Sequence, residues 1–333
     1  MDPERAHDFV LEKGRYFQRR ALPLYFMKKI YRFEHPSLQT NISGLELKNP
    51  VGLAAGFDKN AELMKLVYAM GFGFAEVGSV SAKPSEGNEK PRLWRLVEEE
   101  AVINNMGLPS GGVDSILKRL LSKCLPVGVN ISKTNNPGIE NRDAIDDILY
   151  SCKKASPYAN YLALNISCPN TSQETFEDPN MLDELLGELQ RTGLSAPIFI
   201  KMAPDYSDKK LETIISICEY HNVNGYIISN TRKVSIGGML GGISGPPLRE
   251  ASTENIRRVY ALTQSKKPII GVGGINSAES AYKKIKAGAS LVQLYTALIY
   301  EGPFVVRKIN KGLVKLLERD GFSSISQAVG KEK

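Results

Sequence analysis

Two asparagines and a cysteine lie within the stretch Asn165-Ile166-Ser167-Cys168-Pro169-Asn170-Thr171, directly after the apolar run at 161–164. Side-chain amides offer hydrogen-bond donors and acceptors to a planar polar ligand, and a cysteine between them adds a titratable sulfur. An ordinary turn, in which asparagine binds its own backbone, uses the same residue types. The stretch alone leaves two interpretations open: a ligand-binding site beside a catalytic base, or an ordinary turn.

Apolar runs that are typical of buried strands recur along the chain and alternate with helical patterns. The strands are expected near 51–55, 74–78, 126–131, 161–166, 198–202, 225–229, 268–272 and 291–294, and helices near 178–192, 207–221, 277–287 and 304–319. Eight strands that alternate with helices predict an α/β fold, a (β/α)8 barrel. An open doubly wound sheet is the alternative, but no GxGxxG follows the first strand.

The ends of the predicted strands carry residues that suit a binding site, because a parallel barrel places its functional residues at the C-terminal ends of its strands. They are small, amide, hydroxyl or basic, namely Ala54, Ala55, Gly56 and Lys59, Ser79, Asn130 and Lys133, Asn165 to Asn170, Lys201, Ser229 to Thr231, Gly273 and Gly274, and Tyr295 and Thr296. The glycine-rich seventh end, Gly271 to Gly274, and the turn after Leu294 would expose backbone N–H groups to a phosphate.

Composition excludes several classes of protein. The chain has 42% hydrophobic and 24% charged residues and no apolar run near the roughly 20 residues that a membrane-spanning helix needs. The cysteines Cys124, Cys152, Cys168 and Cys218 lie far apart without a CxxC spacing, so neither disulfides nor a metal site is expected. With no secretory signal at the start, a reduced cytosolic compartment is favoured.

The first 40 residues are predicted to form a helical extension ahead of a catalytic barrel at 41–333. Between Lys13 and Arg32 there are seven basic residues and no acidic one, interleaved with aromatic and aliphatic residues. Pro23 is expected to separate two short helices, each with an apolar and a basic side, which suits an anionic membrane surface. The alternative is a terminal helix pair whose apolar face docks on the barrel.

Two segments are longer than ordinary loops, 81–123 after the second strand and 230–252 after the sixth. Long loops in compact enzymes are usually lids or walls of the site.

Several motifs together resemble dihydroorotate dehydrogenase, specifically its membrane-associated, quinone-using class. They are the stretch 49–60, Gly87-Asn88 with Pro91-Arg92, Ile103-Asn104, 128–131, Ser229-Asn230-Thr231, 242–245, the run 271–330, and Asp2 to His7 at the start. The resemblance implies a barrel with FMN that oxidises (S)-dihydroorotate to orotate in pyrimidine synthesis and passes electrons to a quinone. It also implies a peripheral protein on the cytoplasmic side of a membrane.

The resemblance assigns roles to individual residues. FMN would contact Ala54, Ala55, Gly56, Ser79, Asn130, Lys201, Ser229, Ser244, Gly245, Gly273, Gly274, Tyr295 and Thr296. Substrate would be held by Lys59, Asn104, Asn165, Asn170, Asn230 and Thr231. These types suit orotate, a flat ring with imide-like edges and a carboxylate, for which Lys59 supplies the cation. Lys201 would place its charge near the reduced, anionic flavin.

Cys168 is the catalytic base that the resemblance implies, taking a proton from ring carbon C5 while hydride leaves C6 for flavin N5. Here the chain departs from the quinone-using class, which has serine at this position, whereas the soluble class has cysteine. Met106-Gly107-Leu108-Pro109 also leans toward the soluble class. A thiol with an ordinary pKa near 8.5 ionises more readily than an alcohol, so Cys168 is expected to work at lower pH than serine.

The electron acceptor depends on the N-terminal extension, which in the resembling class caps a quinone tunnel near His7, Arg95 and Tyr295. The alternatives to a tunnel are that His7 lies on a helix surface and that Arg95 pairs with one of the glutamates at 98–100. Fumarate or NAD is the alternative acceptor.

A flavin-dependent tRNA dihydrouridine synthase is a rival enzyme on this scaffold, and a basic protein-interaction module without FMN is the non-enzymatic alternative.

Overall fold

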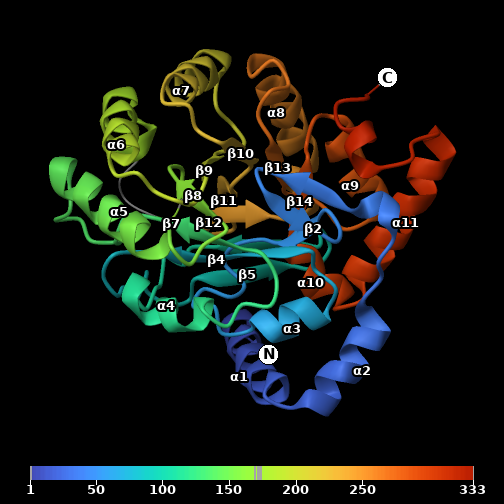
Figure 1. Ribbon diagram of the computed structural model, residues 1–333. Coiled ribbons are helices and arrows are strands. Elements are labelled where there is room, and N and C mark those ends of the chain that lie inside the picture. Colours follow the sequence, from blue (N-terminus) through green and yellow to red (C-terminus); the bar gives the residue numbers. More distant parts are fainter. Residues whose placement is uncertain (1, 169, 171–174, 333) are drawn as a thin grey trace.

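A closed parallel barrel forms the centre of the computed structural model, which describes residues 2–168, 170 and 175–332 (Figure 1). In that part of the chain, eight strands follow one another around the barrel in sequence order: β3 (Val51–Leu53), β4 (Phe74–Val80), β7 (Val127–Ile131), β8 (Tyr161–Asn165), β9 (Ile198–Met202), β10 (Gly225–Ile228), β13 (Ile269–Val272) and β14 (Leu291–Leu294). The predicted (β/α)8 barrel is confirmed.

A ring of helices surrounds the strands in Figure 1. They are α3 (Met64–Ala69), α4 (Val113–Leu120), α5 (Asn141–Ala155), α6 (Pro179–Arg191), α7 (Asp208–Tyr220), α8 (Arg249–Leu262), α9 (Ala278–Lys286), α10 (Thr296–Glu301) and α11 (Val305–Asp320). In α6 the buried residues Leu182, Leu185, Leu186 and Leu189 recur at helical spacing and form one apolar face. The four helices predicted from the sequence are present, with ends shifted by one residue.

The interior of the barrel is filled by aromatic side chains that face glycines on neighbouring strands. A Cβ on Gly52 would lie 2.4 Å from the Phe74 ring, and one on Gly128 would lie 2.0 Å from the Tyr161 ring. A short hairpin of β1 (Thr40–Ile42) and β2 (Leu45–Leu47) adds Leu45 and Leu47 to this core. Packing therefore closes the barrel's interior and leaves a ligand the space at the strands' C-terminal ends.

The two long segments meet in a second, antiparallel sheet. Its strands are β5 (Leu93–Leu96), β6 (Ala101–Asn104), β11 (Arg232–Ile236) and β12 (Met239–Ser244), in the order β11-β12-β6-β5. Asn104 at the end of β6 and Ser244 at the end of β12 both line the cavity described below. Residues of both long segments therefore line this cavity, as expected for lids or walls of a site.

The N-terminal extension forms α1 (Pro3–Gln18) and α2 (Ala21–Tyr31), which lie beside α3 in Figure 1. Asp2 caps α1 by accepting the Arg5 N–H at 2.9 Å. The chain breaks at Arg19 and Arg20, so the prediction that Pro23 separates the helices is wrong in position. Pro23 lies in the first turn of α2, where proline is tolerated because that N–H has no intrahelical partner.

The two helices bury one face and expose another. Gly14 lets α1 approach α3's N-terminal end closely, since a Cβ there would lie 2.9 Å from Leu63. The exposed large side chains are Phe9, Val10, Tyr16, Phe17, Leu22, Tyr25, Phe26 and Ile30. Among the described residues, no helix combines the length and the apolar character needed to cross a bilayer.

Candidate active site

A cavity of about 600 Å³ lies between the strand ends, the second sheet and α1. It brings together almost every residue that the sequence singled out: Ala54, Ala55, Gly56, Lys59, Ser79, Asn104, Asn165, Cys168, Asn170, Lys201, Ser229, Asn230, Thr231, Ser244, Gly245, Gly273, Gly274, Tyr295 and Thr296, with His7 and Arg95. Asn130 lies behind this wall and accepts a hydrogen bond from the Ser79 hydroxyl. Pro169 and Thr171 of the first motif lie outside the described residues.

The four asparagines converge from three separate segments, the end of β6, the end of β8 with the stretch after it, and the loop after β10. Asn230 Nδ2 donates to Asn165 Oδ1 at 2.9 Å, and Asn170 Nδ2 donates to Asn104 Oδ1 at 2.7 Å. Within the described chain, Asn170 Oδ1 is buried and has no donor. Because a buried acceptor without a donor is costly, a ligand N–H here would remove that cost. The amides of Asn165 and Asn170 pair with asparagines from other segments rather than with their own turn, which favours a ligand-binding site over an ordinary turn.

Cys168 lines the same cavity and is half-buried. Burial raises the pKa of its thiol to about 11, while the backbone N–H of Asn170 and the charge of Lys201 act in the opposite direction. The expectation of an ordinary thiol pKa is therefore wrong for this site. The thiol still ionises more readily than an alcohol, so its suitability as a base relative to serine is retained.

A fully buried carboxylate organises the floor of the cavity. Glu76 Oε1 accepts from Asn130 Nδ2 at 2.8 Å and from Lys201 Nζ at 3.1 Å, and Oε2 accepts from Tyr161 and Gln293 at 3.1 and 3.0 Å. Four donors on one carboxylate satisfy it away from water. This network fixes the ammonium of Lys201 at the cavity edge.

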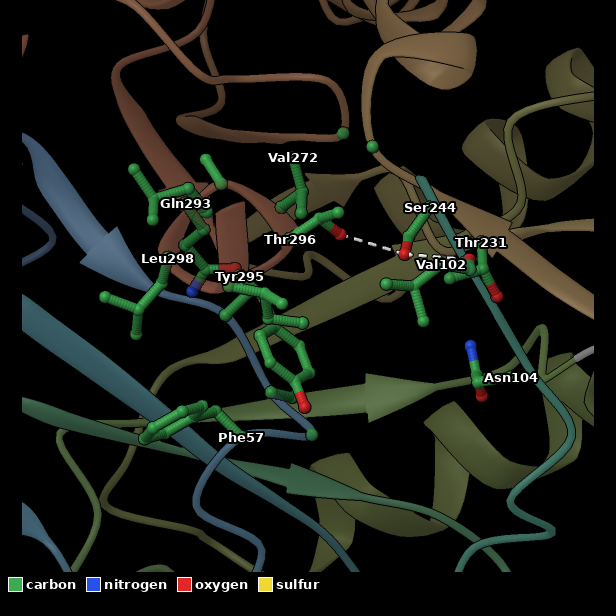
Figure 2. A pocket seen from close by; sticks show the side chains of 18 of the residues that line it. Phe57, Val102, Asn104, Thr231, Ser244, Val272, Gln293, Tyr295, Thr296 and Leu298 are labelled. Carbon is green, nitrogen blue, oxygen red and sulfur yellow. Dashed lines mark hydrogen bonds between the residues drawn. The ribbon is translucent and has the colours of Figure 1, made fainter. Parts of the chain in front are cut away.

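Sequence reasoning missed Glu76 and Gln293. The available signal was a charged or amide residue inside an otherwise apolar strand, as in Phe74-Ala75-Glu76-Val77 and Leu291-Val292-Gln293-Leu294. Gln293 Oε1 is buried without a hydrogen-bond donor among the described residues, and Gln293 faces the pocket in Figure 2. A ligand donor would satisfy this oxygen as well.

Lys59 places a lysine side chain in the lining of the cavity. Its Nζ donates to Gly56 O at 2.9 Å. Burial lowers the pKa of Lys59 to about 8, and the negative charge of Glu4 opposes this shift. The preceding Asp58 is buried and accepts the backbone N–H groups of Glu62 and Leu63, each at 2.7 Å, which holds the loop in place. A ligand carboxylate beside Lys59 would favour its charged form.

A second part of the cavity lining is aromatic and comes from α1, the loop after β3 and the turn before α10. The His7 ring lies 5.5 Å from the Phe57 ring and 6.4 Å from the Tyr295 ring, between ring centroids. Its Nε2 is buried with no partner in the described chain, and burial lowers the pKa of His7 to about 3. His7 is therefore neutral and turned inward, so the alternative of a histidine on an outer helix surface is wrong. Arg95 of β5 also lines this side.

An ion pair joins α1 to the loop that leads into the second sheet. Arg92 Nη2 donates to Glu4 Oε1 at 2.9 Å, both residues being buried, and Arg92 Nη1 donates to the carbonyls of Glu86 and Asn88. The side chain of Asn88 in turn donates to Asn170 O at 3.1 Å. The first helix thus helps to hold the amide cluster.

Glycine backbone forms the third part of the site. Gly245, Gly273 and Gly274 have φ of +100°, +105° and +71°, and a Cβ on Gly274 would lie 2.6 Å from Arg249. Thr296 Oγ1 donates to Ser244 Oγ at 2.9 Å, a contact drawn in Figure 2. Bare backbone and hydroxyl groups here form a concave surface that suits an anionic group.

Comparisons with known proteins agree with this geometry. A family model described as dihydroorotate dehydrogenase matches residues 37–317. A protein named dihydroorotate dehydrogenase (quinone) from Natronomonas pharaonis is 45% identical over 305 residues, 89% of this chain and 86% of that protein. The mitochondrial dihydroorotate dehydrogenase (quinone) of Mus musculus is 39% identical over 354 residues, 99% of this chain and 87% of that protein.

A solved structure gives the same result. The crystal structure of DHODH from Eimeria tenella in complex with ferulenol has a TM-score of 0.85 and 34% identity, and the match covers 99% of this chain and 95% of that one. The ligand-free enzyme from the same organism matches equally well, over 99% of both chains. The resemblance inferred from the motifs is confirmed, and this chain belongs to the dihydroorotate dehydrogenase family.

Proposed function

We propose that this chain oxidises (S)-dihydroorotate to orotate, a step of pyrimidine synthesis, with FMN as cofactor and a quinone as electron acceptor. The observation that carries the proposal is the convergence of Asn104, Asn165, Asn170 and Asn230 with Lys59 and Cys168 on one cavity in a chain of this family. Relatives named as quinone-dependent support the choice of acceptor. The residue roles below are part of the proposal.

The cavity fits a phosphorylated flavin. The glycine backbone at Gly245, Gly273 and Gly274 leaves room and N–H groups for a phosphate. Gln293 Oε1, which has no hydrogen-bond donor among the described residues, matches a flat ring with N–H groups. Ala54, Ala55, Gly56, Ser79, Asn130, Lys201, Ser229, Ser244, Tyr295 and Thr296 would complete the contacts. Bound FMN would supply the acceptor for the hydride that leaves C6 of dihydroorotate.

The amide cluster binds and orients the substrate ring. Asn165 and Asn230 offer both donors and acceptors to its imide-like edges, together with Asn104, Asn170 and Thr231. Lys59 pairs with the substrate carboxylate, and that carboxylate raises the pKa of Lys59 back toward its ordinary value. Several convergent contacts hold C5 toward Cys168, which is the geometry that proton transfer requires.

Cys168 removes the proton from C5 as a thiolate. Because burial raises its pKa, only a minor fraction of the thiol is ionised at neutral pH, and the positive charge of Lys201 partly offsets this. The proton moves from carbon to sulfur while the flat product is retained by the amides. The thiol must then lose the proton before the next turnover.

The aromatic wall around His7, Phe57 and Tyr295 receives the quinone, because its groups are apolar or neutral. Arg95 provides a polar contact at the same side. Fumarate and NAD are the alternative acceptors, raised by the cysteine at position 168. The rings of His7, Phe57 and Tyr295 match an apolar quinone ring better than a small dicarboxylate or a large charged dinucleotide.

The exposed aromatic and basic side chains of α1 and α2 support the proposal that the protein binds an anionic membrane surface, on its cytoplasmic side. Tyr25, Phe26 and Ile30 are exposed on α2, where Lys28 and Lys29 supply positive charge. Sedimentation with vesicles containing phosphatidylglycerol tests this, with phosphatidylcholine vesicles as the control. Equal binding to both contradicts the preference for an anionic surface, and binding to neither contradicts the membrane role.

The central test follows flavin absorbance without oxygen. The purified protein is expected to be yellow, to bleach on addition of dihydroorotate, and to recover its colour faster with a ubiquinone analogue than with fumarate or NAD. A colourless protein that takes up no FMN would favour an interaction module. Bleaching that needs another reductant would favour a relative such as a tRNA dihydrouridine synthase, and faster recovery with fumarate would overturn the quinone.

A further inference from the structure

Lys284 of α9 is a buried cation that the chemistry above does not use. Its side chain is completely buried, and its Nζ lies 2.9 Å from Ser252 Oγ, 3.1 Å from Thr253 Oγ1 and 3.3 Å from Arg249 O. All three partners are neutral oxygens. Among the described residues, the ion pairs of this region include Lys283 with Glu250 at 2.7 Å but none with Lys284.

A buried ammonium without a paired carboxylate is unfavourable. Burial lowers the pKa of Lys284 to about 7, with a smaller opposing effect from Glu250. Arg249 and Arg257 of α8, together with the neighbouring Lys283, add further positive charge around it. The charged form of Lys284 therefore gains from an anion that comes close to it.

The turn at Gly273-Gly274, which lines the cavity, is connected to Lys284 through Ser252. Ser252, which accepts from Lys284, donates to the carbonyl of Val272, and Arg249 Nε donates to Gly274 O at 2.9 Å. The backbone carbonyls of Val272 and Gly274, the residues on either side of Gly273, thus accept hydrogen bonds from side chains of α8. Because a trans peptide directs its N–H opposite to its C=O, the N–H groups of Gly273 and Ile275 point away from α8, and both residues line the cavity.

We propose that Lys284 is the counter-charge for the phosphate of the cofactor, acting through Ser252 and the Gly273-Gly274 turn without touching the phosphate itself. The inference rests on the proposed use of FMN and assigns a residue that selects the phosphorylated flavin over riboflavin. The ligand class is a phosphate monoester dianion. Lys284 is a positioning residue in this role, because its effect is transmitted by its field and by the serine relay.

The test compares FMN with riboflavin, which share the ring and differ in the phosphate. Full-length protein is freed of flavin, its fold is checked by circular dichroism, and the two dissociation constants are measured by quenching of flavin fluorescence. Lys284→Met is expected to weaken FMN binding about tenfold or more while riboflavin binding changes by less than about twofold. Lys283→Met, which removes the adjacent surface lysine, is the matched control and is expected to leave both unchanged.

A second variant covers the case in which Lys284→Met does not fold. Ser252→Ala keeps the lysine and breaks its relay to Val272, and it is expected to lower the preference for FMN over riboflavin in the same direction. Equal losses for both flavins, or an unchanged preference in a folded variant, would overturn the role of Lys284. Failure of the unaltered protein to bind FMN would instead overturn the proposed function, so the two failures are distinguishable.

Discussion

The two sides of the cavity are built on different principles. On the strand-end side, Glu76 collects four donors from Asn130, Lys201, Tyr161 and Gln293, and the asparagines bond one another across the barrel. On the α1 side, His7, Phe57 and Tyr295 meet as rings, and the histidine nitrogen has no partner among the described residues. The first side is preorganised for a polar ring and the second for an apolar ligand, so the two half-reactions should respond to different substitutions.

Replacement of the base is expected to have the largest effect and to confine it to one side. Cys168→Ala should slow anaerobic flavin bleaching by dihydroorotate by about a thousandfold, the scale of a lost general base, with FMN retained. Stopped-flow absorbance measures the rate, and Cys124→Ala, an exposed cysteine outside the cavity lining, is the control. Fast bleaching in Cys168→Ala would remove this residue from the role.

The floor network is expected to contribute strongly to stability, unlike the aromatic wall. Glu76→Gln leaves Lys201 as an uncompensated buried charge and should cost about 3 kcal/mol of unfolding free energy, measured in urea. The exposed Glu46→Gln in β2 is the matched control. An unchanged midpoint would show that the carboxylate does not hold this side together.

The pH dependence should separate the sides as well. Since burial raises the pKa of Cys168 to about 11, the thiolate fraction and the bleaching rate should increase about tenfold per pH unit between pH 6 and pH 9. His7, whose pKa is lowered to about 3, stays neutral over that range, so it gives quinone reoxidation no pH dependence. A bleaching rate that is flat over this range would show that an already ionised group is the base.

The smallest effect is expected at the aromatic wall. His7→Ala should raise the KM for a ubiquinone analogue about fivefold through lost packing, and the bleaching rate with dihydroorotate should stay within about twofold. His35→Ala, outside the cavity lining, is the control in the same steady-state assay. Equal losses in both half-reactions would break the distinction between the two sides.

Local patterns in the sequence were sufficient to predict the barrel and most of its lining. Apolar runs with turn residues at their ends located all eight strands, and the parallel topology then gathered their ends. The helix break was misplaced because proline within a first turn and proline between helices look alike in a sequence.

Residues whose role depends on burial were harder to predict. Lys284 belongs to Lys283-Lys284-Ile285-Lys286, which has the appearance of a solvent-exposed helical run, and only the packing of α9 against α8 buries it. His7 turns inward and the Cys168 pKa rises for the same reason, since desolvation is a property of the assembled structure. Sequence identified the types of groups, and tertiary packing set their charge states.

The buried ion pair between Glu4 and Arg92 bears on how shortened forms of this protein would behave. Deleting the first helix would strip a buried guanidinium of its counter-ion, and that guanidinium braces the loop carrying Asn88, whose side chain holds the backbone of Asn170. A shortened chain would thus lose rigidity around dihydroorotate as well as the outer helix. Point substitutions on the exposed faces of the first two helices are the cleaner way to test the proposed membrane attachment separately from catalysis.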